Sequence, residues 1–241
     1  MQGDQHKQHI SNQFNAELDT MKNHLLEMGG LVEQQLQLAL DSLLRRDSGQ
    51  AAAAIAADRE INGMQLRIDE ECSRILALRQ PAASDLRLVL AVAKSTTDLE
   101  RIGDEATKIS RQAIKLSELA PAASHATSIH QVGRRVGTML RDALDSFARL
   151  DVRKAIEVVI DDDAVDSKYD ELMDSLEASM RSDARAISAL LHEMWALRGL
   201  ERVGDHATNL AEQVVYLVRG VDIRHMKVGE LGDLLRAEER A

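Results

Sequence analysis

The chain has 241 residues, of which 44% are apolar, 2% aromatic and 29% charged, and it contains only two prolines. So few aromatic residues argue against β-sandwiches and barrels, whereas an apolar share drawn from Ala, Leu and Met favours an all-α protein. The formal net charge of −10 argues against nucleic acid as a partner, because nucleic-acid binding needs a basic face.

Residue counts argue against a disulfide-linked protein and against a membrane-spanning one. A single cysteine, Cys72, cannot form an internal disulfide. The longest apolar run, 51–57, is far shorter than the ~20 residues that span a bilayer. The first six residues have neither the basic region nor the apolar segment of a signal peptide. We therefore expect a cytosolic protein that does not insert directly into the membrane.

The first half of the chain predicts three helices. Apolar residues recur at steps of three or four over 21–43, which is typical of a helix with one buried stripe, and Asp-Ser-Gly at 47–49 ends it. A second helix is predicted over about 50–78 and stops before Pro81, since proline disfavours helical geometry in the residue before it. A third follows, to about residue 119, and Ser84 can cap it.

The second half repeats the first. The stretch 120–124 is linker-like, and beyond it Ala-Leu-Asp-Ser of 39–42 recurs at 143–146. The nine residues 99–107 match 200–208 at seven positions, which implies a short deletion in the loop before the second copy. We therefore predict an all-α fold of two tandem, pseudo-repeated antiparallel three-helix bundles with six long helices.

The repeat also predicts domain boundaries. The first bundle is expected over 1–120 and the second over 121–241. Gly220 is a candidate C-cap of the sixth helix. The short charged tail over 221–241 is expected to be frayed or only partly helical.

Known catalytic motifs are absent from the sequence. It contains no glycine-rich phosphate loop, no Cys-x-x-Cys and no His-Glu-x-x-His. The di-iron bundle signature also fails, because neither Glu100 nor Glu201 is followed by histidine three residues later.

Paired acids are the strongest chemical signal. Glu100 and Asp104 are four residues apart, so their side chains share one helix face, and Glu201 and Asp205 repeat the pattern. Like charges repel at this spacing, whereas a bound hard cation would make the pair favourable. Oxygen ligands suit Mg, Mn, Fe or Ca rather than thiophilic metals.

A second interpretation of these acids stays open. The apolar residues near Glu100 lie on roughly the opposite side of the helix, and Arg101 and Lys108 flank the acids, so the pairs are also compatible with a solvated face with local ion pairs. Gly103 and Gly204, in mid-helix, each require a close helix approach or a ligand.

Several motifs together resemble one family. The chain is similar, from about His9 to His225, to the PhoU family, the accessory proteins of the bacterial high-affinity phosphate transporter. The motifs that carry this resemblance are Gln13-Phe14-Asn15-Ala16-Glu17-Leu18, Met28-Gly29-Gly30-Leu31-Val32-Glu33, Arg79-Gln80-Pro81-Ala82-Ala83-Ser84-Asp85-Leu86-Arg87, both Glu-Arg-x-Gly-Asp copies, and Tyr216-Leu217-Val218-Arg219-Gly220.

The resemblance implies a function and partners. It implies two tandem three-helix bundles in a cytoplasmic, often dimeric protein that negatively regulates phosphate uptake and the phosphate-starvation two-component response. The implied partners are the membrane sensor histidine kinase PhoR and the transporter ATPase PstB.

The resemblance also implies metal sites. In the family, metal ions sit at acidic E(D)xxxD motifs, which correspond here to Glu100 with Asp104 and Glu201 with Asp205. The second helix of each repeat often adds Asp-x-x-x-Asp. The identity of the divalent or trivalent ion, whether Fe, Mn, Mg or Zn, stays open. The matching residues are Asp162 and Asp166 in the second copy and, in the first, Asp58 followed by Asn62, whose amide is a weaker ligand than a carboxylate.

Three loop residues match family motifs and are candidate partner contacts: Asp85, Arg87 and Arg185. Their alternative interpretation is structural, with Asp85 as a helix cap and the arginines as ordinary surface residues.

Two functions are compatible with these features. The first is a non-enzymatic regulator, a rigid adaptor between the transporter ATPase and the sensor kinase. The second is a metal-dependent enzyme, such as a helical-bundle oxidase or a phosphohydrolase that uses the acidic clusters, although histidine ligands, a general base and a nucleophile are missing.

Overall fold

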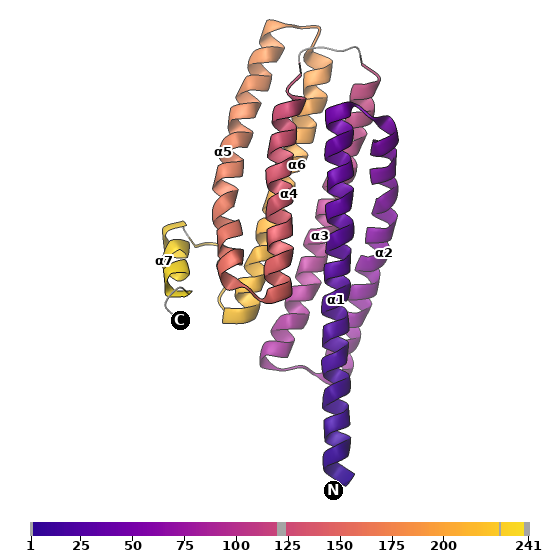
Figure 1. Cartoon of the computed structure of the whole chain (residues 1–241), viewed down its shortest axis with the longest axis vertical. Helices are drawn as coiled ribbons and strands as arrows, with labels where there is room; N and C mark the ends of the chain where they lie inside the picture. Colours follow the sequence, from indigo (N-terminus) through magenta and orange to yellow (C-terminus); the bar gives the residue numbers. More distant parts are fainter. Residues whose placement is uncertain (1, 120–123, 227, 239–241) are drawn as a thin grey trace.

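The structure is a computed structural model that describes residues 2–119, 124–226 and 228–238, with side chains described over 12–119, 124–226 and 229–236. Within these ranges the chain forms seven helices and no strand, which confirms the all-α prediction (Figure 1). The helices are α1 (Gln2–Arg45), α2 (Ser48–Arg79), α3 (Ala83–Ser117), α4 (Ala126–Arg149), α5 (Val152–Ser182), α6 (Ile187–Arg219) and α7 (Val228–Glu238).

The six long helices form two sets of three that lie side by side (Figure 1). Helices α1 to α3 pack on one another, and so do α4 to α6.

The second helix of each set begins with the same cap. The Asp47 carboxylate accepts hydrogen bonds from the amides of Gly49 and Gln50, and Asp151 accepts one from the amide of Lys154. The repeat seen in the sequence is therefore a repeat in the local structure.

Helix ends follow the breakers in the sequence, with one exception. Gly220 has a φ of +69° and its amide bonds the Tyr216 carbonyl, which confirms the predicted C-cap. Helix α3, however, begins at Ala83 after an N-cap residue, Ala82, that makes no side-chain hydrogen bond. The prediction that Ser84 caps this helix was wrong, because Ser84 already lies within its first turn.

The two sets meet along two pairs of helices, α3 with α6 and α1 with α4. At the α1–α4 contact the repeat produces a reciprocal arrangement. A Cβ atom at Gly29 would come within 2.5 Å of Leu144 Cδ2, and a Cβ atom at Gly133 would overlap Leu40 in the same way. Glycine at both positions lets each helix accept a leucine from the other, so the contact has pseudo-twofold symmetry.

Two parts of the chain extend beyond the predicted helices. Helix α1 begins at Gln2, well before the stripe that starts at Met21, and its first turns project beyond the other helices (Figure 1). The tail contains α7, which packs against α5 and buries Leu231.

The predicted boundary between 120 and 121 lies outside the described residues. In the described part of the chain, no helix has the length and hydropathy needed to cross a membrane.

Candidate functional site

Helices α3 and α6 carry the paired acids and form the centre of the molecule. Leu99 and Ile102 are fully buried, whereas Glu100 and Asp104 are half-buried. In α6 Leu200 is likewise buried, while Glu201 is half-buried and Asp205 is exposed. The acids therefore lie apart from the core face, as the helical spacing predicted.

The first acidic cluster joins α2 to α3. Asp58 Oδ2 accepts a hydrogen bond of 3.1 Å from Asn62, and Asp58 Oδ1 accepts one of 3.3 Å from the Thr107 hydroxyl. Burial, followed by the charge of Asp104, raises the pKa of Glu100. The Asn62 Oδ1 atom is buried and has no hydrogen-bond partner within the described residues. A cation held by these carboxylates would give that oxygen a partner.

Gly103 is explained by close packing at this cluster. The Gln35 amide group donates to Thr107 Oγ1 at 3.1 Å and to the Ala54 carbonyl at 3.1 Å. A Cβ atom at Gly103 would lie 3.1 Å from Gln35 Oε1, closer than an ordinary van der Waals contact. The glycine thus makes room for a buried amide of α1, which satisfies the predicted close approach.

The second acidic cluster joins α5 to α6. Burial and the charges of Asp166 and Asp205 raise the pKa of Asp162 to about 6. Burial and the charge of Asp205 also raise the pKa values of Asp166 and Glu201, and burial raises that of Asp205. The charges of Asp205 and Asp166 therefore destabilise the charged forms of neighbouring carboxyl groups, and a cation at this surface would relieve that repulsion.

The donor chemistry of both clusters fits a hard cation, but their side chains are not gathered as a coordination sphere. Among the residues that the structure describes, no group of three or more histidine, cysteine, aspartate or glutamate side chains is arranged to hold a metal ion. Metal binding at these motifs would therefore need rotamer changes that bring the oxygens together.

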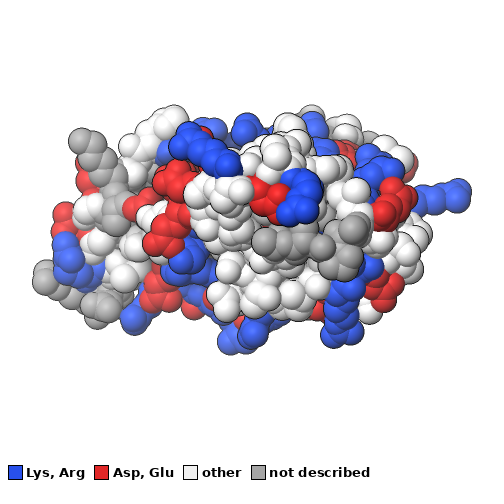
Figure 2. Space-filling model, turned by 90° about the horizontal axis from the view of Figure 1, so that it is seen from above, with Lys and Arg blue, Asp and Glu red and all other residues white. Residues whose placement is uncertain are grey.

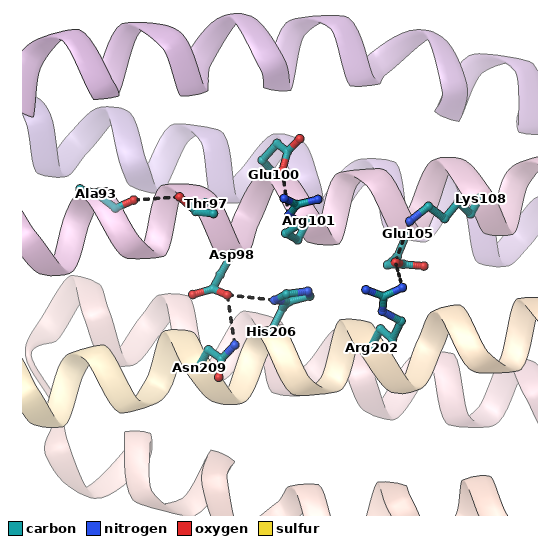
Figure 3. Close-up of polar contacts among 10 residues, drawn as sticks. All are labelled: Ala93, Thr97, Asp98, Glu100, Arg101, Glu105, Lys108, Arg202, His206 and Asn209. Carbon is teal, nitrogen blue, oxygen red and sulfur yellow. Dashed lines mark hydrogen bonds and ion pairs between the residues drawn. The ribbon is translucent and has the colours of Figure 1, made fainter. Parts of the chain in front are cut away.

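A polar network crosses from α3 to α6. We call the contact surface between these two antiparallel helices the α3–α6 seam (Figure 3). Asp98 Oδ1 lies 2.9 Å from His206 Nδ1 and accepts a 3.1 Å hydrogen bond from the Asn209 amide. Further along, the buried Glu105 carboxylate pairs with Lys108 at 2.9 Å and with Arg202 at 3.2 Å (Figure 3).

This network was not predicted from the sequence, although the repeat contained a signal for it. Within the matched nine-residue segments, only one difference changes the chemistry of the side chain, Glu105 in the first copy and His206 in the second. Both residues reach across the α3–α6 seam to the other helix. A difference inside a conserved repeat thus marked the surface where the two copies meet.

A buried acid near the end of the α3–α6 seam was also not predicted from the sequence. Glu212 is only 8% exposed, and its burial raises the pKa of the carboxyl to about 7. Its Oε2 atom has no hydrogen-bond partner within the described part of the chain. It lines a cleft of about 280 Å³ together with Lys94, Asp98 and Arg224.

The three candidate partner contacts have different environments. Asp85 lies in the first turn of α3 but is not its cap. The Arg87 guanidinium donates to the Leu217 carbonyl of α6 at 3.2 Å, so it also joins the two helix sets. Arg185 is exposed before α6, and Asp183 accepts hydrogen bonds from its backbone amide at 3.0 Å and from its guanidinium at 3.4 Å.

Comparison with known proteins gives one consistent family. The PhoU domain profile matches residues 25–113 and 129–214. A phosphate-specific transport system accessory protein PhoU homolog of Pseudomonas putida is 52% identical over 218 residues, covering 90% of this chain and 85% of that protein. The accessory protein PhoU of Escherichia coli K12 is 41% identical over 232 residues, covering 96% and 95%.

Solved structures show the same fold. The crystal structure of PhoU from Pseudomonas aeruginosa has a TM-score of 0.85 at 50% identity and covers 86% of this chain and 100% of that chain. The phosphate transport system regulatory protein PhoU from Streptococcus pneumoniae has a TM-score of 0.80 at 32% identity, covering 87% and 98%.

Proposed function

Because the chain belongs to the PhoU family, we propose that it regulates phosphate uptake as an accessory protein of a phosphate-specific transport system. The observation that carries this proposal is the agreement of relatives at 41% and 52% identity, aligned over most of both chains and named as accessory proteins of that system. A solved relative is named as a regulatory protein of phosphate transport. These names describe accessory and regulatory proteins, so we propose that this chain acts without catalysing a reaction.

The finer role is that of an adaptor. The chain acts in the cytoplasm, as a homodimer, between the transporter ATPase PstB and the sensor kinase PhoR, and it represses phosphate uptake and the phosphate-starvation response. An adaptor needs a rigid body with exposed side chains, and the long helices with their polar surfaces provide one. The loop residues Asp85, Arg87 and Arg185 are candidate contacts for these partners.

Metal binding belongs to the same proposal. Glu100 and Asp104, with Asp58, would hold an ion in the first cluster. The four carboxyl groups of the second cluster would hold one between α5 and α6. Bound metal supplies positive charge that fixes α2 to α3 and α5 to α6, and the mutually raised pKa values of the second cluster support this assignment. The residues of the second site would be Asp162, Asp166, Glu201 and Asp205.

A binding assay tests the adaptor role. The tagged full chain is incubated with purified PstB and, separately, with the purified cytoplasmic part of PhoR, and each mixture is analysed by size-exclusion chromatography with light scattering. We expect a complex with each partner. If neither partner changes the elution of the chain at micromolar concentration, the adaptor role is wrong.

A further inference from the structure

Gln35 of α1 is a buried polar residue beside the first acidic cluster. It is 0% exposed, and its Nε2 group donates to the Ala54 carbonyl of α2 and to Thr107 Oγ1 of α3, both at 3.1 Å. Because both partners accept these hydrogen bonds through an oxygen, they fix the orientation of the amide. One side chain of α1 is therefore hydrogen-bonded to both other helices of its set.

The Thr107 hydroxyl connects this amide to an acid. Two other buried hydroxyl groups of α3, those of Thr96 and Ser110, donate to the backbone carbonyl four residues earlier. Thr107 instead donates to Asp58 Oδ1 of α2 at 3.3 Å. A hydroxyl has a single proton, and the bond accepted from Gln35 leaves that proton for Asp58. We call Gln35, Thr107 and Asp58 the Gln35 network.

Asp58 is the acid of the first cluster that is held from two sides. Its Oδ2 atom accepts a hydrogen bond from Asn62, so both carboxylate oxygens have a donor. Within the described residues, the Glu100 side chain has only an ion pair of 3.7 Å with Arg101, and the Asp104 side chain has neither a hydrogen bond nor an ion pair (Figure 3). Asp58 is therefore the fixed carboxylate toward which the other two acids can turn.

The donors to Asp58 are neutral, unlike the partners of many acids on the outer surface. At the end of the molecule, acidic and basic side chains lie interspersed (Figure 2). In the described part of the chain, half-buried Asp58 pairs with no basic side chain. A carboxylate has about four lone-pair sites, so the two that Thr107 and Asn62 leave free are available to a hard cation.

The second copy of the repeat lacks the Gln35 network. Met139 of α4 corresponds to Gln35 and has no group that donates a hydrogen bond. Asp166 of α5 corresponds to Asn62. The first cluster thus has two amides, one of them from α1, where the second copy has a thioether and a carboxylate. The same repeat therefore contains two differently built acidic clusters.

We propose that Gln35 and Thr107 position Asp58 for cation binding in the first acidic cluster, so that this site involves all three helices of its set. Hydrogen bonds to a ligating group hold it in the binding orientation in advance, and their removal weakens metal binding by about 10–100-fold. Without the Gln35 donor, the Thr107 hydroxyl is free to turn to a backbone carbonyl and release Asp58. This inference rests on the metal binding of the proposed function and adds a residue of α1 to it.

A manganese titration tests the positioning role. The reference is the full chain with Glu201→Ala/Asp205→Ala, which removes two ligands of the second cluster, and free Mn²⁺ is measured by electron paramagnetic resonance. In this reference, Gln35→Met introduces the residue of the second copy and should weaken Mn²⁺ binding about tenfold. The matched control, Ser42→Ala, removes another buried polar group of α1 and should change binding less than about twofold, because Ser42 bonds only the Ala39 carbonyl.

Substitutions of Thr107 separate positioning from packing. Thr107→Val removes the hydroxyl at nearly constant shape and should weaken Mn²⁺ binding about tenfold, whereas Thr107→Ser retains the hydroxyl and should bind within about threefold of the reference. Gln35→Met combined with Thr107→Val should bind as weakly as Thr107→Val alone, because both substitutions break the same network.

The second cluster controls for damage to the fold. In the full chain with Glu100→Ala/Asp104→Ala, Mn²⁺ binding reports on the second cluster alone. Adding Gln35→Met to this chain should change that binding less than about twofold, because the Gln35 network does not reach α5. Equal weakening at both clusters would assign Gln35 to the general packing of the fold and overturn the positioning role.

The remaining outcomes distinguish this inference from the proposed function. If Gln35→Met binds Mn²⁺ as tightly as the reference, or if the losses from Gln35→Met and Thr107→Val add, the positioning role is wrong while the first metal site stands. If the reference itself binds no Mn²⁺, the first metal site is wrong and the inference falls with it. None of these results alters complex formation with PstB or PhoR, so the regulatory role is judged separately.

Discussion

His206 Nδ1 lies 2.9 Å from Asp98 Oδ1, and this contact ties the sixth helix to the third. The corresponding residue of the first copy, Glu105, makes the opposite contact, from the third helix to Arg202 of the sixth. Two nearly identical segments thus diverged at one position into an acid and an imidazole, and each found a partner across the α3–α6 seam. Charge complementarity at this seam is a consequence of the repeat rather than of either bundle alone.

Removing the buried carboxylate of the α3–α6 seam should destabilise the protein. Glu105→Gln removes the negative charge that Arg202 and Lys108 share, and we expect a loss of about 1 kcal/mol in the free energy of unfolding, measured in urea. The control is Glu118→Gln, whose pair with Lys115 is exposed and should contribute less than about 0.5 kcal/mol. Equal effects of the two substitutions would contradict the assigned role of Glu105.

Neighbouring glycines of α1 should respond in opposite directions to alanine. Gly29→Ala pushes a Cβ atom into Leu144 and should cost about 1 kcal/mol net, because overpacking exceeds the gain in helix propensity. Gly30 faces open space, so Gly30→Ala should stabilise the helix by about 0.5–1 kcal/mol. Urea denaturation of both variants measures the difference, and stabilisation by both would show that α1 and α4 do not pack this closely.

The buried acid Glu212 should make stability depend on pH. Its pKa is raised to about 7 from 4.5, so the folded state holds the proton more tightly than the unfolded chain. This group therefore destabilises the fold increasingly as pH rises from 4.5 to about 7, and the loss is complete above that range.

Replacing Glu212 removes that dependence. Glu212→Gln should be more stable than the parent chain by up to about 3 kcal/mol at about pH 8, and equal to it near about pH 4. Thermal or urea unfolding across this range measures the effect. Glu60→Gln, at an exposed position of α2, is the control and should follow the parent curve. If the stability of Glu212→Gln differed from that of the parent chain by the same amount at every pH, the proposed titration of Glu212 would be refuted.

Metal binding should be stronger in the second acidic cluster. Its α5 ligands are both carboxylates, whereas the first cluster has Asn62. Elemental analysis of metal-loaded protein should therefore show a larger loss for Glu201→Ala/Asp205→Ala than for Glu100→Ala/Asp104→Ala. Loading should also fall below about pH 6, because protons compete with metal for Asp162. Unchanged metal content in both double variants would rule out these sites.

Much of the fold was predictable because it is encoded locally. The breakers near Pro81 and the left-handed Gly220 placed the end of α2, the start of α3 and the end of α6 within a few residues, whereas α1 begins at Gln2, well before the apolar stripe that starts at Met21. Helical periodicity alone predicted that Glu100 and Asp104 lie on the same face of one helix. The helix in the tail was only half predicted, since its stability comes from burying Leu231 in a contact with α5 that no local pattern reveals.

Contacts between the bundles were not predictable in the same way. The Glu105 pair with Arg202 depends on the register of two helices about a hundred residues apart, and the sequence specifies that register only through the summed packing of both cores. The burial of Glu212 has the same origin, because the segment after Gly220 brings Arg224 to its cleft. Divergence within the repeat was the one sequence signal available for these long-range contacts.

The proposed regulatory role is tested most directly by a transcriptional reporter for phosphate-starvation genes, in cells that lack this protein and grow in phosphate-rich medium. We predict high reporter expression in the deletion strain and repression when the chain is restored from a plasmid. Normal repression in the deletion strain, at the phosphate concentration that represses the reporter in the parent strain, would contradict this account.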